Sequence, residues 1–284
     1  MPMPGTMGGA KIVFRDNPYM SKIGIIGVGY VGGAIASAAQ DFIDVILVDP
    51  AKGYNTTIAD LKDTEGVFIC VPSPQGDDGR CDTSILESVL KELKAIDYTG
   101  VIISKCTAPP DVYEQLNELY PNLVHAPEFL TAANAFVDYL NGKFAIIGGK
   151  VTAYRNEAER IIRITQTSLG DNVRHCSIGE ASLAKYTINS FLATKVTFMN
   201  ELWGIATAFG LDYDTIAEMV KMDTRIGLSH MKVPGPDGQF GFGGACFPKD
   251  TSALLKLAEQ KNVSMNVLDA AVKKNILLRL TDSK

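Results

Sequence analysis

A glycine-rich turn near the start of the chain sets the strongest limit on its fold. The apolar segment Lys22–Ile26 is followed by Gly27-Val28-Gly29-Tyr30-Val31-Gly32 and then by an alanine-rich segment. The pattern Gly-x-Gly-x-x-Gly between a strand and a helix is typical of dinucleotide-binding folds. The first glycine allows a tight turn, the second lets a pyrophosphate approach the backbone, and the third lets helix and strand pack closely. The sequence therefore predicts dinucleotide contacts from Gly27, Gly29, Tyr30, Val31 and Gly32.

A second apolar segment, Val45–Val48, ends in Asp49, where an acidic residue commonly binds the ribose hydroxyls. A carboxylate at this position repels a 2′-phosphate, which favours NAD over NADP as the cofactor. Further cofactor contacts are predicted from Pro72, Ser73, Thr107 and Lys249. The alternative is a Rossmann-like domain that keeps its glycines for packing and binds no nucleotide.

From residue 21 to about Cys176, strand-like and helix-like segments alternate along the chain. The expected strands are nearly continuous apolar runs, as in sheets covered on both faces: Lys22–Gly27, Val45–Val48, Gly66–Val71, Val101–Ser104, Leu123–His125 and Phe144–Gly148. The expected helices between them are Gly29–Gln40, Ser84–Lys94, Asp111–Leu119 and Thr152–Leu169. This alternation predicts an α/β fold with a doubly wound parallel sheet of the Rossmann type, which binds ligands beyond the carboxyl ends of its strands.

The chain becomes helical after Gly179. The expected helices are Glu180–Phe209, one that starts at Asp212, Thr251–Gln260 and Ser264–Leu280. We therefore expect a mobile tail at residues 1–20, a cofactor domain at 21–179 and an all-helical dimerisation domain at 180–284. The long apolar helix is the expected dimerisation element, because such a helix needs a cover.

Two polar residues of the long helix, Lys185 and Asn189, are four residues apart and hence lie on one face. An isolated pair of this kind usually faces solvent. Here the neighbouring Ala184, Ile188 and Leu192 indicate a largely buried helix, in which an unpaired lysine would be costly. A catalytic or substrate site would supply the missing partner.

Cys246 follows the glycine-rich run Gly241–Gly244 and precedes the expected helix of Thr251–Gln260. A thiol at a helix N-terminus feels the positive end of the helix dipole, and Lys249 adds a cation nearby. Both effects are expected to favour the thiolate, which is the reactive form. The alternative is a glycine-rich turn beside a small core cysteine.

Composition excludes several classes of function. The 284 residues carry a formal net charge of −5 and contain no strongly basic run, so nucleic acid and acidic membranes are unlikely partners. The five cysteines form no Cys-x-x-Cys pair, which indicates reduced thiols, a cytoplasmic setting and no metal site. No apolar run is long enough to span a membrane.

Taken together, the motifs resemble the UDP-glucose dehydrogenase family, the nucleotide-sugar 6-dehydrogenases. Besides the glycine turn, the matching stretches occur in the family's order: Lys105-Cys106-Thr107-Ala108-Pro109, Ala126-Pro127-Glu128-Phe129-Leu130, Lys185-Tyr186-Thr187-Ile188-Asn189, Met222-Asp223-Thr224-Arg225-Ile226-Gly227 and the segment around Cys246. The resemblance implies that two NAD+ oxidise the C6 alcohol of UDP-glucose to a carboxylate through a thiohemiacetal and a thioester on the cysteine.

The resemblance also implies a role for individual residues. Cys246 would be the nucleophile, Lys185 and Asn189 would stabilise oxyanions, and water and protons would be handled by Asp250, Glu128 and Thr107. The substrate would contact Glu128, Phe129, Leu130, Lys185, Asn189, Arg225, Phe240 and Gly243, with Arg225 reaching across a homodimer.

The family usually carries a third, Rossmann-like domain that grips the substrate's nucleotide, so we expect a short form that lacks it. Three alternatives follow. The substrate is UDP-N-acetylmannosamine or GDP-mannose. The chain is an idle NAD-binding subunit that needs a separate nucleotide-binding partner. Or it is a two-electron 2-hydroxy-acid dehydrogenase of the 6-phosphogluconate type, which uses a lysine and no cysteine.

Overall fold

The computed structural model describes residues 22–39, 42–131, 134–166 and 168–281. The tail expected at residues 1–20 lies outside the described residues, as does Gln40 at the end of the first expected helix.

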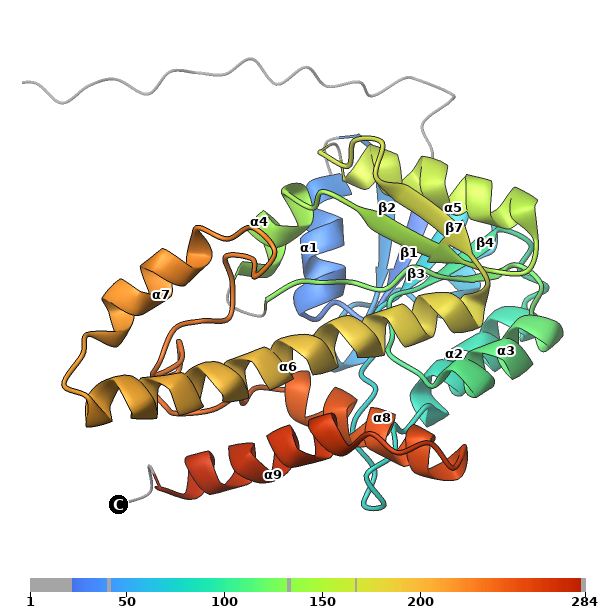
Figure 1. Ribbon diagram of the computed structural model, residues 1–284. Helices are drawn as coiled ribbons and strands as arrows, with labels where there is room; N and C mark the ends of the chain where they lie inside the picture. Colours follow the sequence, from blue (N-terminus) through green and yellow to red (C-terminus); the bar gives the residue numbers. More distant parts are fainter. Residues whose placement is uncertain (1–21, 40–41, 132–133, 167, 282–284) are drawn as a thin grey trace, which may run out of the picture.

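A seven-stranded sheet forms the first part of the chain, with the order β2-β1-β3-β4-β5-β6-β7 (Figure 1). Its strands are β1 (Lys22–Ile26), β2 (Asp44–Val48), β3 (Gly66–Ile69), β4 (Val101–Ser104), β5 (Leu123–His125), β6 (Ala145–Gly148) and β7 (Val173–Cys176). Neighbouring strands pair in parallel except β5 and β6, which are antiparallel through His125 and Gly148. The predicted α/β class with a Rossmann-type sheet is therefore confirmed, with one antiparallel pairing that the sequence did not reveal.

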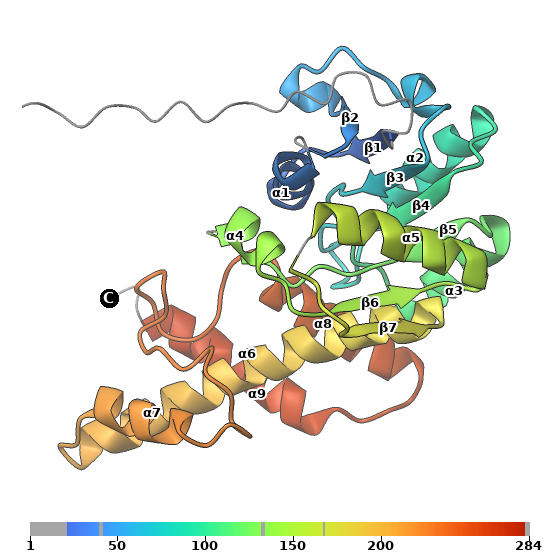
Figure 2. The same cartoon turned by 90° about the horizontal axis from the view of Figure 1, so that it is seen from above.

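Helices cover both faces of the sheet (Figure 2). The first core lies between the sheet and α1 (Tyr30–Ala39), α4 (Ala135–Leu140) and α5 (Thr152–Thr165), and it includes Ile35 and Ile161. The second core lies between the sheet and α2 (Ser84–Ala95) and α3 (Pro110–Leu119), and it includes Leu90 and Tyr113. Burial on both faces explains why the central strands are continuous apolar runs.

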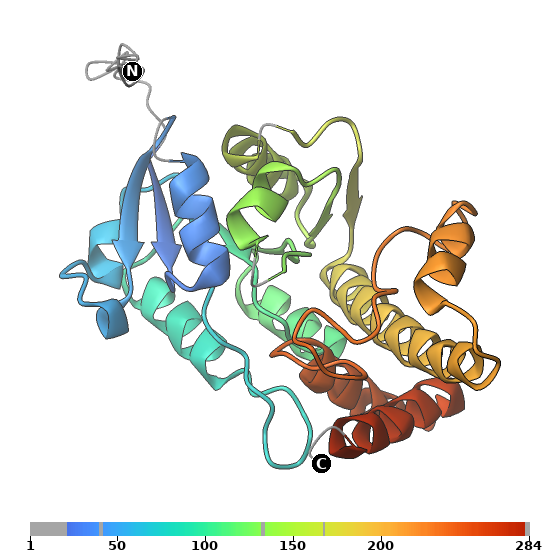
Figure 3. The ribbon, with the colours of Figure 1, turned by 90° about the vertical axis from the view of Figure 1, so that its left-hand side faces the viewer.

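The second part of the chain is helical (Figure 3). Its helices are α6 (Ile178–Ala208), α7 (Tyr213–Lys221), α8 (Phe247–Gln260) and α9 (Asn266–Thr281). A capping box starts α6, because Ser177 Oγ accepts from the backbone N–H of Glu180 while the Glu180 carboxylate accepts from that of Ser177. The α6 helix packs against α3, α8 and α9, and so joins the sheet region to the last helices.

Two elements were missed by the sequence reading, and one helix is shorter than expected. The α4 helix has only six residues, which is too short for a clear helical period. The edge strand β7 includes exposed Arg174 and His175, so it lacks the apolar run expected of a strand. The α5 helix ends at Thr165, four residues before the expected end.

A buried histidine gives the fold a pH dependence. His125 is stacked on Tyr113 with 4.2 Å between ring centroids, and its Nδ1 lies 3.1 Å from the carbonyl oxygen of Ser104. Burial lowers the pKa of His125 to about 3. Below pH 6.5 this histidine therefore binds a proton in the unfolded chain but stays neutral in the folded chain. The free energy of unfolding falls as the pH falls from 6.5 towards 3.

We expect this group to remove about 2 kcal/mol of the free energy of unfolding between pH 7 and pH 5. Urea unfolding at the two pH values measures the loss. His125→Phe keeps an aromatic ring on Tyr113 but cannot titrate, so its loss over the same interval should be smaller by that amount. Equal losses in both proteins would contradict the assignment.

None of the helices among the described residues combines the length and apolar character of a membrane span.

Candidate active site

The glycine turn has the geometry that a dinucleotide needs. Gly27 has a φ of +87°, and a Cβ there would lie 2.7 Å from the carbonyl oxygen of Cys70. A Cβ on Gly32 would lie 2.0 Å from the carbonyl oxygen of Gly27, so the close approach of α1 to β1 requires a glycine. A Cβ on Gly29 would meet nothing within 4 Å, which leaves the backbone open at the N-terminus of α1. These three positions fit a bound pyrophosphate.

Asp49 lies beside this turn, where the sequence predicts ribose binding. Its Oδ2 accepts from the backbone N–H of Val28 at 2.8 Å, which fixes the carboxylate next to the turn. Lys52 donates to the carbonyl oxygen of Val28 and is a contact that the sequence reading missed. Of the other predicted cofactor residues on α1, Tyr30 is 72% exposed and Val31 is half-buried.

Pro72, Ser73 and Thr107 follow the carboxyl ends of β3 and β4, so they lie at the same edge of the sheet as the glycine turn. Pro72 is exposed, whereas Ser73 is buried. The carbonyl oxygen of Thr107 accepts from Cys81 Sγ at 3.1 Å. The predicted cofactor residues of the sheet region are thus brought to one edge, as the rule for parallel α/β sheets requires.

Lys185 forms an ion pair with Glu128, which is the kind of partner that the sequence predicts for a buried lysine. Lys185 Nζ lies 2.9 Å from Glu128 Oε1 and also donates to the carbonyl oxygen of Glu128. Lys185 is buried and Glu128 is largely buried, with 5% and 13% of their side-chain surface exposed. Glu128 Oε2 accepts from the backbone N–H of Leu130 at 2.7 Å, so this carboxylate also shapes its own loop.

Asn189 lies one turn further along α6, and its partner is Asp250. Asn189 Nδ2 donates to Asp250 Oδ2 at 2.6 Å, and Lys249 Nζ forms an ion pair with Asp250 Oδ1. Asp250 is 1% exposed and Asn189 is 6% exposed. Two charged pairs from distant parts of the chain are thus joined to one face of α6, as the spacing of Lys185 and Asn189 predicts.

Cys246 immediately precedes α8, and the backbone N–H of Asp250 donates to its carbonyl oxygen at 2.9 Å. The residue as a whole is exposed, yet partial desolvation raises the pKa of its thiol. Glu128 and Asp250 also raise this pKa, while Lys185 and Lys249 lower it. The charges that act on the thiol are therefore those of the two buried pairs.

This result corrects the expectation that the helix N-terminus and Lys249 favour the thiolate. Lys249 is paired with Asp250, so its charge is largely offset. The thiol therefore needs a base, or the negative charge of its surroundings must be neutralised, before it reacts.

The predicted substrate residues are only partly brought together. Phe129 lies under Lys185, whose Nζ is 5.2 Å from the ring centroid, and Leu130 is held by Glu128. Phe240 packs edge-on against Trp203 with 4.7 Å between centroids, and both rings pack against the apolar cluster that includes Met199. Arg225 is exposed, and among the described residues its side chain forms hydrogen bonds and an ion pair with Asp223, 2.6 Å away, rather than with another predicted site residue.

Three residues that the sequence reading missed hold the glycine run before Cys246. Asn275 of α9 accepts from the N–H of Phe242 at 2.6 Å and donates to its carbonyl oxygen at 3.0 Å. Asn200 of α6 accepts from the N–H of Gly241 at 3.0 Å. Arg279 Nε donates to the Phe242 carbonyl oxygen at 3.1 Å, and its Nη2 fills the space where a Cβ on Gly243 would lie.

Asn275→Ala should weaken the fold and the site together. The variant leaves the buried N–H of Phe242 without its acceptor, which costs about 1–3 kcal/mol. We expect urea unfolding to show this loss of stability, and we expect a protease to cleave the loop at residues 235–245 faster than in the parent protein. Asn156→Ala, on the exposed face of α5, is the control and should leave both measurements unchanged. A loop equally resistant to protease in both variants would contradict the assigned role.

Two family models match the chain. The NAD-binding domain of the UDP-glucose/GDP-mannose dehydrogenase family matches residues 52–166, and the central domain of the same family matches residues 179–276.

Individual proteins show the same relationship. The chain is 34% identical to a UDP-glucose 6-dehydrogenase of Rickettsia bellii over 76% of its own length and 50% of that protein. It is 31% identical to a putative UDP-glucose 6-dehydrogenase of Bacillus subtilis over 88% of its length and 66% of that protein. A UDP-glucose dehydrogenase structure from Pyrobaculum islandicum has the same fold, with a TM-score of 0.76 at 24% identity over 91% of this chain and 68% of that one. The chain thus spans between half and two thirds of these two curated relatives.

Proposed function

The chain belongs to the UDP-glucose/GDP-mannose dehydrogenase family, and we propose that it oxidises the C6 alcohol of a nucleotide sugar, UDP-glucose, to the uronate with NAD as cofactor. The observation that carries this proposal is the placement of Cys246 among the charges of the Glu128–Lys185 and Asp250–Lys249 pairs. A two-electron oxidation would not need a thiol at this position, whereas a four-electron oxidation does.

The cofactor site fits the turn of Gly27, Gly29 and Gly32, with Asp49 beside it for the ribose. NAD+ bound there would supply the hydride acceptor for both oxidations. The sheet edge that carries Ser73 and Thr107 would hold the rest of the cofactor, and Lys249 would complete its contacts.

The protein's own chemistry centres on the Cys246 sulfur. Once the alcohol is an aldehyde, the thiolate adds to the carbonyl carbon and gives a thiohemiacetal. Loss of the second hydride converts this adduct into a thioester, and water then releases the carboxylate and restores the thiol. A thiolate serves here both as a strong nucleophile and as a good leaving group.

The two buried pairs would control the charges that develop. Lys185 and Asn189 are held on one face of α6 and can donate to the oxyanion of each tetrahedral adduct. Glu128 and Asp250 are the buried carboxylates, and each can hold a water or take a proton. Thr107 would help to position the water at the end of β4.

Domain organisation and assembly are also part of this proposal. We place the cofactor domain at residues 21–179 and the helical domain at 180–284, with a tail before them. The long helix α6 exposes large apolar residues at intervals of seven or eight positions: Leu183, Phe191, Phe198 and Ile205. Such a row supports a homodimer through α6, which would let Arg225 of one chain reach the substrate of the other.

The nucleotide half of the substrate is where the alternatives differ. The two curated relatives described above are longer than the part of them that this chain matches. A separate nucleotide-binding partner, UDP-N-acetylmannosamine or GDP-mannose as substrate, and an idle NAD-binding subunit therefore stay as competing proposals.

One assay separates these proposals. The purified chain is incubated with NAD+ and, in turn, UDP-glucose, UDP-N-acetylmannosamine and GDP-mannose, and NADH and product are measured. We expect two NADH per UDP-glucose and a uronate. One NADH with a stable ketone would rule out the four-electron reaction, and no NADH with any sugar would support the idle subunit.

A further inference from the structure

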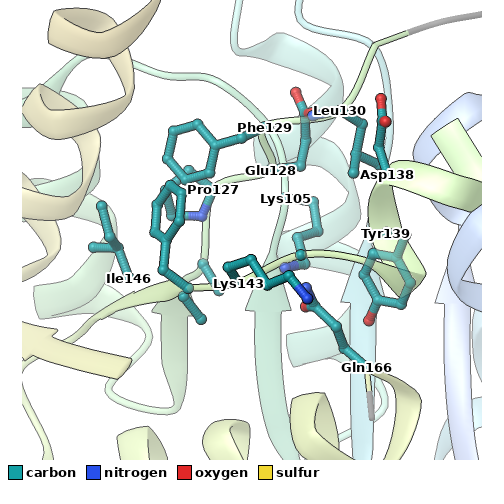
Figure 4. Close-up of a pocket in the computed structure, with 14 residues that line it drawn as sticks. Lys105, Pro127, Glu128, Phe129, Leu130, Asp138, Tyr139, Lys143, Ile146 and Gln166 are labelled. Carbon is teal, nitrogen blue, oxygen red and sulfur yellow. The ribbon is translucent and has the colours of Figure 1, made fainter. Parts of the chain in front are cut away.

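A pocket on the other side of the Glu128 loop shares Glu128, Phe129 and Leu130 with the predicted substrate site, but its remaining lining residues have no part in the chemistry above (Figure 4). It has a volume of about 110 Å³ and is lined by residues that directly follow β4, β5 and α5, by α4, and by residues 142–146 up to the start of β6. The lining includes Lys105, Tyr139 and Gln166, whereas Cys246, Asn189 and Asp250 do not contribute. It therefore belongs to the side of the sheet that α1 and α5 cover, behind the carboxylate that faces α6.

Two nearly buried donors extend into this pocket. Lys105 is 9% exposed and Gln166 is 8% exposed, and in Figure 4 their polar ends point toward one another across the cavity. Lys143 lies on the same wall and is exposed. Within the described part of the chain, no hydrogen bond or ion pair engages the side-chain nitrogens of these three residues. The ammonium group of Lys105 lies over the Phe68 ring, with Nζ 5.9 Å from the ring centroid.

The carboxylates on the pocket wall are already engaged elsewhere. Glu128 pairs with Lys185 and accepts from the N–H of Leu130. Asp138 accepts from the backbone N–H of Thr131 at 2.8 Å and from its hydroxyl group. Lys105 and Lys143 of the pocket, together with Lys185, carry three positive charges. Glu128 and Asp138 carry two negative charges, which leaves one positive charge in excess.

A buried cation that no carboxylate pairs with directly is costly, and an anion bound beside it relieves that cost. Burial lowers the pKa of Lys105 to about 8, so this amine is still mostly charged at neutral pH. The amide of Gln166 adds a neutral donor, and the apolar rings of Phe129 and Phe144 close another wall. Two ammonium groups and an amide suit a tetrahedral oxyanion, whose size this cavity accommodates.

We propose that this pocket binds a phosphate or phosphoryl group through Lys105 and Gln166, with Lys143 at its mouth. Gly142 makes the arrangement possible, because a Cβ there would lie 1.8 Å from Gln166 Nε2 and would displace the amide. Cys246 does not line this pocket, whereas Glu128, whose charge acts on the thiol, does.

Binding is measured by calorimetry and by thermal unfolding in phosphate-free buffer, so no step depends on catalytic activity. The ligands are inorganic phosphate, UDP-glucose and NAD+, each added alone. Lys105→Met should bind phosphate roughly ten- to hundredfold more weakly. Gln166→Met and Gly142→Ala should weaken binding in the same direction while the lysine stays in place. Lys91→Met, at an exposed position of α2, is the charge-matched control and should bind as the parent does.

The three ligands identify the source of the phosphoryl group. Binding of inorganic phosphate that both Lys105→Met and Gln166→Met weaken supports a free oxyanion. If only UDP-glucose or only NAD+ shows that dependence, a phosphoryl group of that ligand is the occupant. If Lys105→Met folds with the parent's thermal stability or better, and all three ligands bind or fail to bind as they do in the parent, the proposal is overturned. Gln166→Met gives the same decision if Lys105→Met does not fold.

Discussion

Replacement of Cys246 by serine should abolish formation of the uronate. A serine hydroxyl has a far higher pKa than a thiol and is a poorer leaving group, so neither the adduct nor the acyl intermediate should form at a useful rate. We expect the rate of NADH production with UDP-glucose to fall by roughly 10³-fold or more. The parent and the variant are compared under saturating NAD+, with product analysis for aldehyde and acid.

A second cysteine provides the control for this substitution. Cys176 is half-buried on the edge strand β7, and its Sγ contacts the carbonyl oxygen of Ile147 rather than any predicted site residue. Cys176→Ser should therefore leave NADH production close to that of the parent. If Cys246→Ser retained the parent's rate and two NADH per sugar, the thiol would have no part in the reaction.

Replacement of Lys185 by methionine should damage both activity and stability. The activity should fall by roughly 10²- to 10³-fold, because the oxyanion loses a fixed cation. The free energy of unfolding should fall by about 3–5 kcal/mol, because the Glu128 carboxylate stays buried without its partner. Enzyme assays and urea unfolding of the same preparations measure the two effects.

A double variant separates the two effects. In Lys185→Met with Glu128→Gln, no uncompensated buried carboxylate remains, so most of the lost stability should return. The activity should stay low, because neither the cation nor the carboxylate is present. Recovery of activity together with stability would show that Lys185 acts only through folding, and would contradict its assigned role on the oxyanion.

Local patterns were sufficient to predict the parts of the site that lie close together in sequence. The glycine turn of residues 27–32 follows from its spacing, and the structure gives it the required close approaches. Lys185 and Asn189 are four residues apart on a helix, so a shared face was predictable. Their burial was also predictable, from the apolar residues beside them.

Tertiary contacts explain what the sequence could not show. The raised pKa of Cys246 depends on burial and on Glu128, which lies 118 positions earlier and approaches the thiol only in the fold. The anchors of the glycine run, Asn275 and Arg279, come from a helix more than thirty residues further along the chain. Charge and hydrogen-bond partners of this kind leave no periodic signal in a single sequence.

The tie between α9 and the glycine run has a consequence for partial unfolding. The sheet keeps its own two apolar cores, whereas the backbone N–H and carbonyl groups of Phe242 are held by Asn275 and Arg279, which both lie on α9. Detachment of the final helix would therefore free the segment that leads to the sulfur before the nucleotide-binding half loses any of its packing. If the proposed reaction holds, this partly unfolded state would still bind the dinucleotide, but its Cys246 would no longer be positioned to form the thioester.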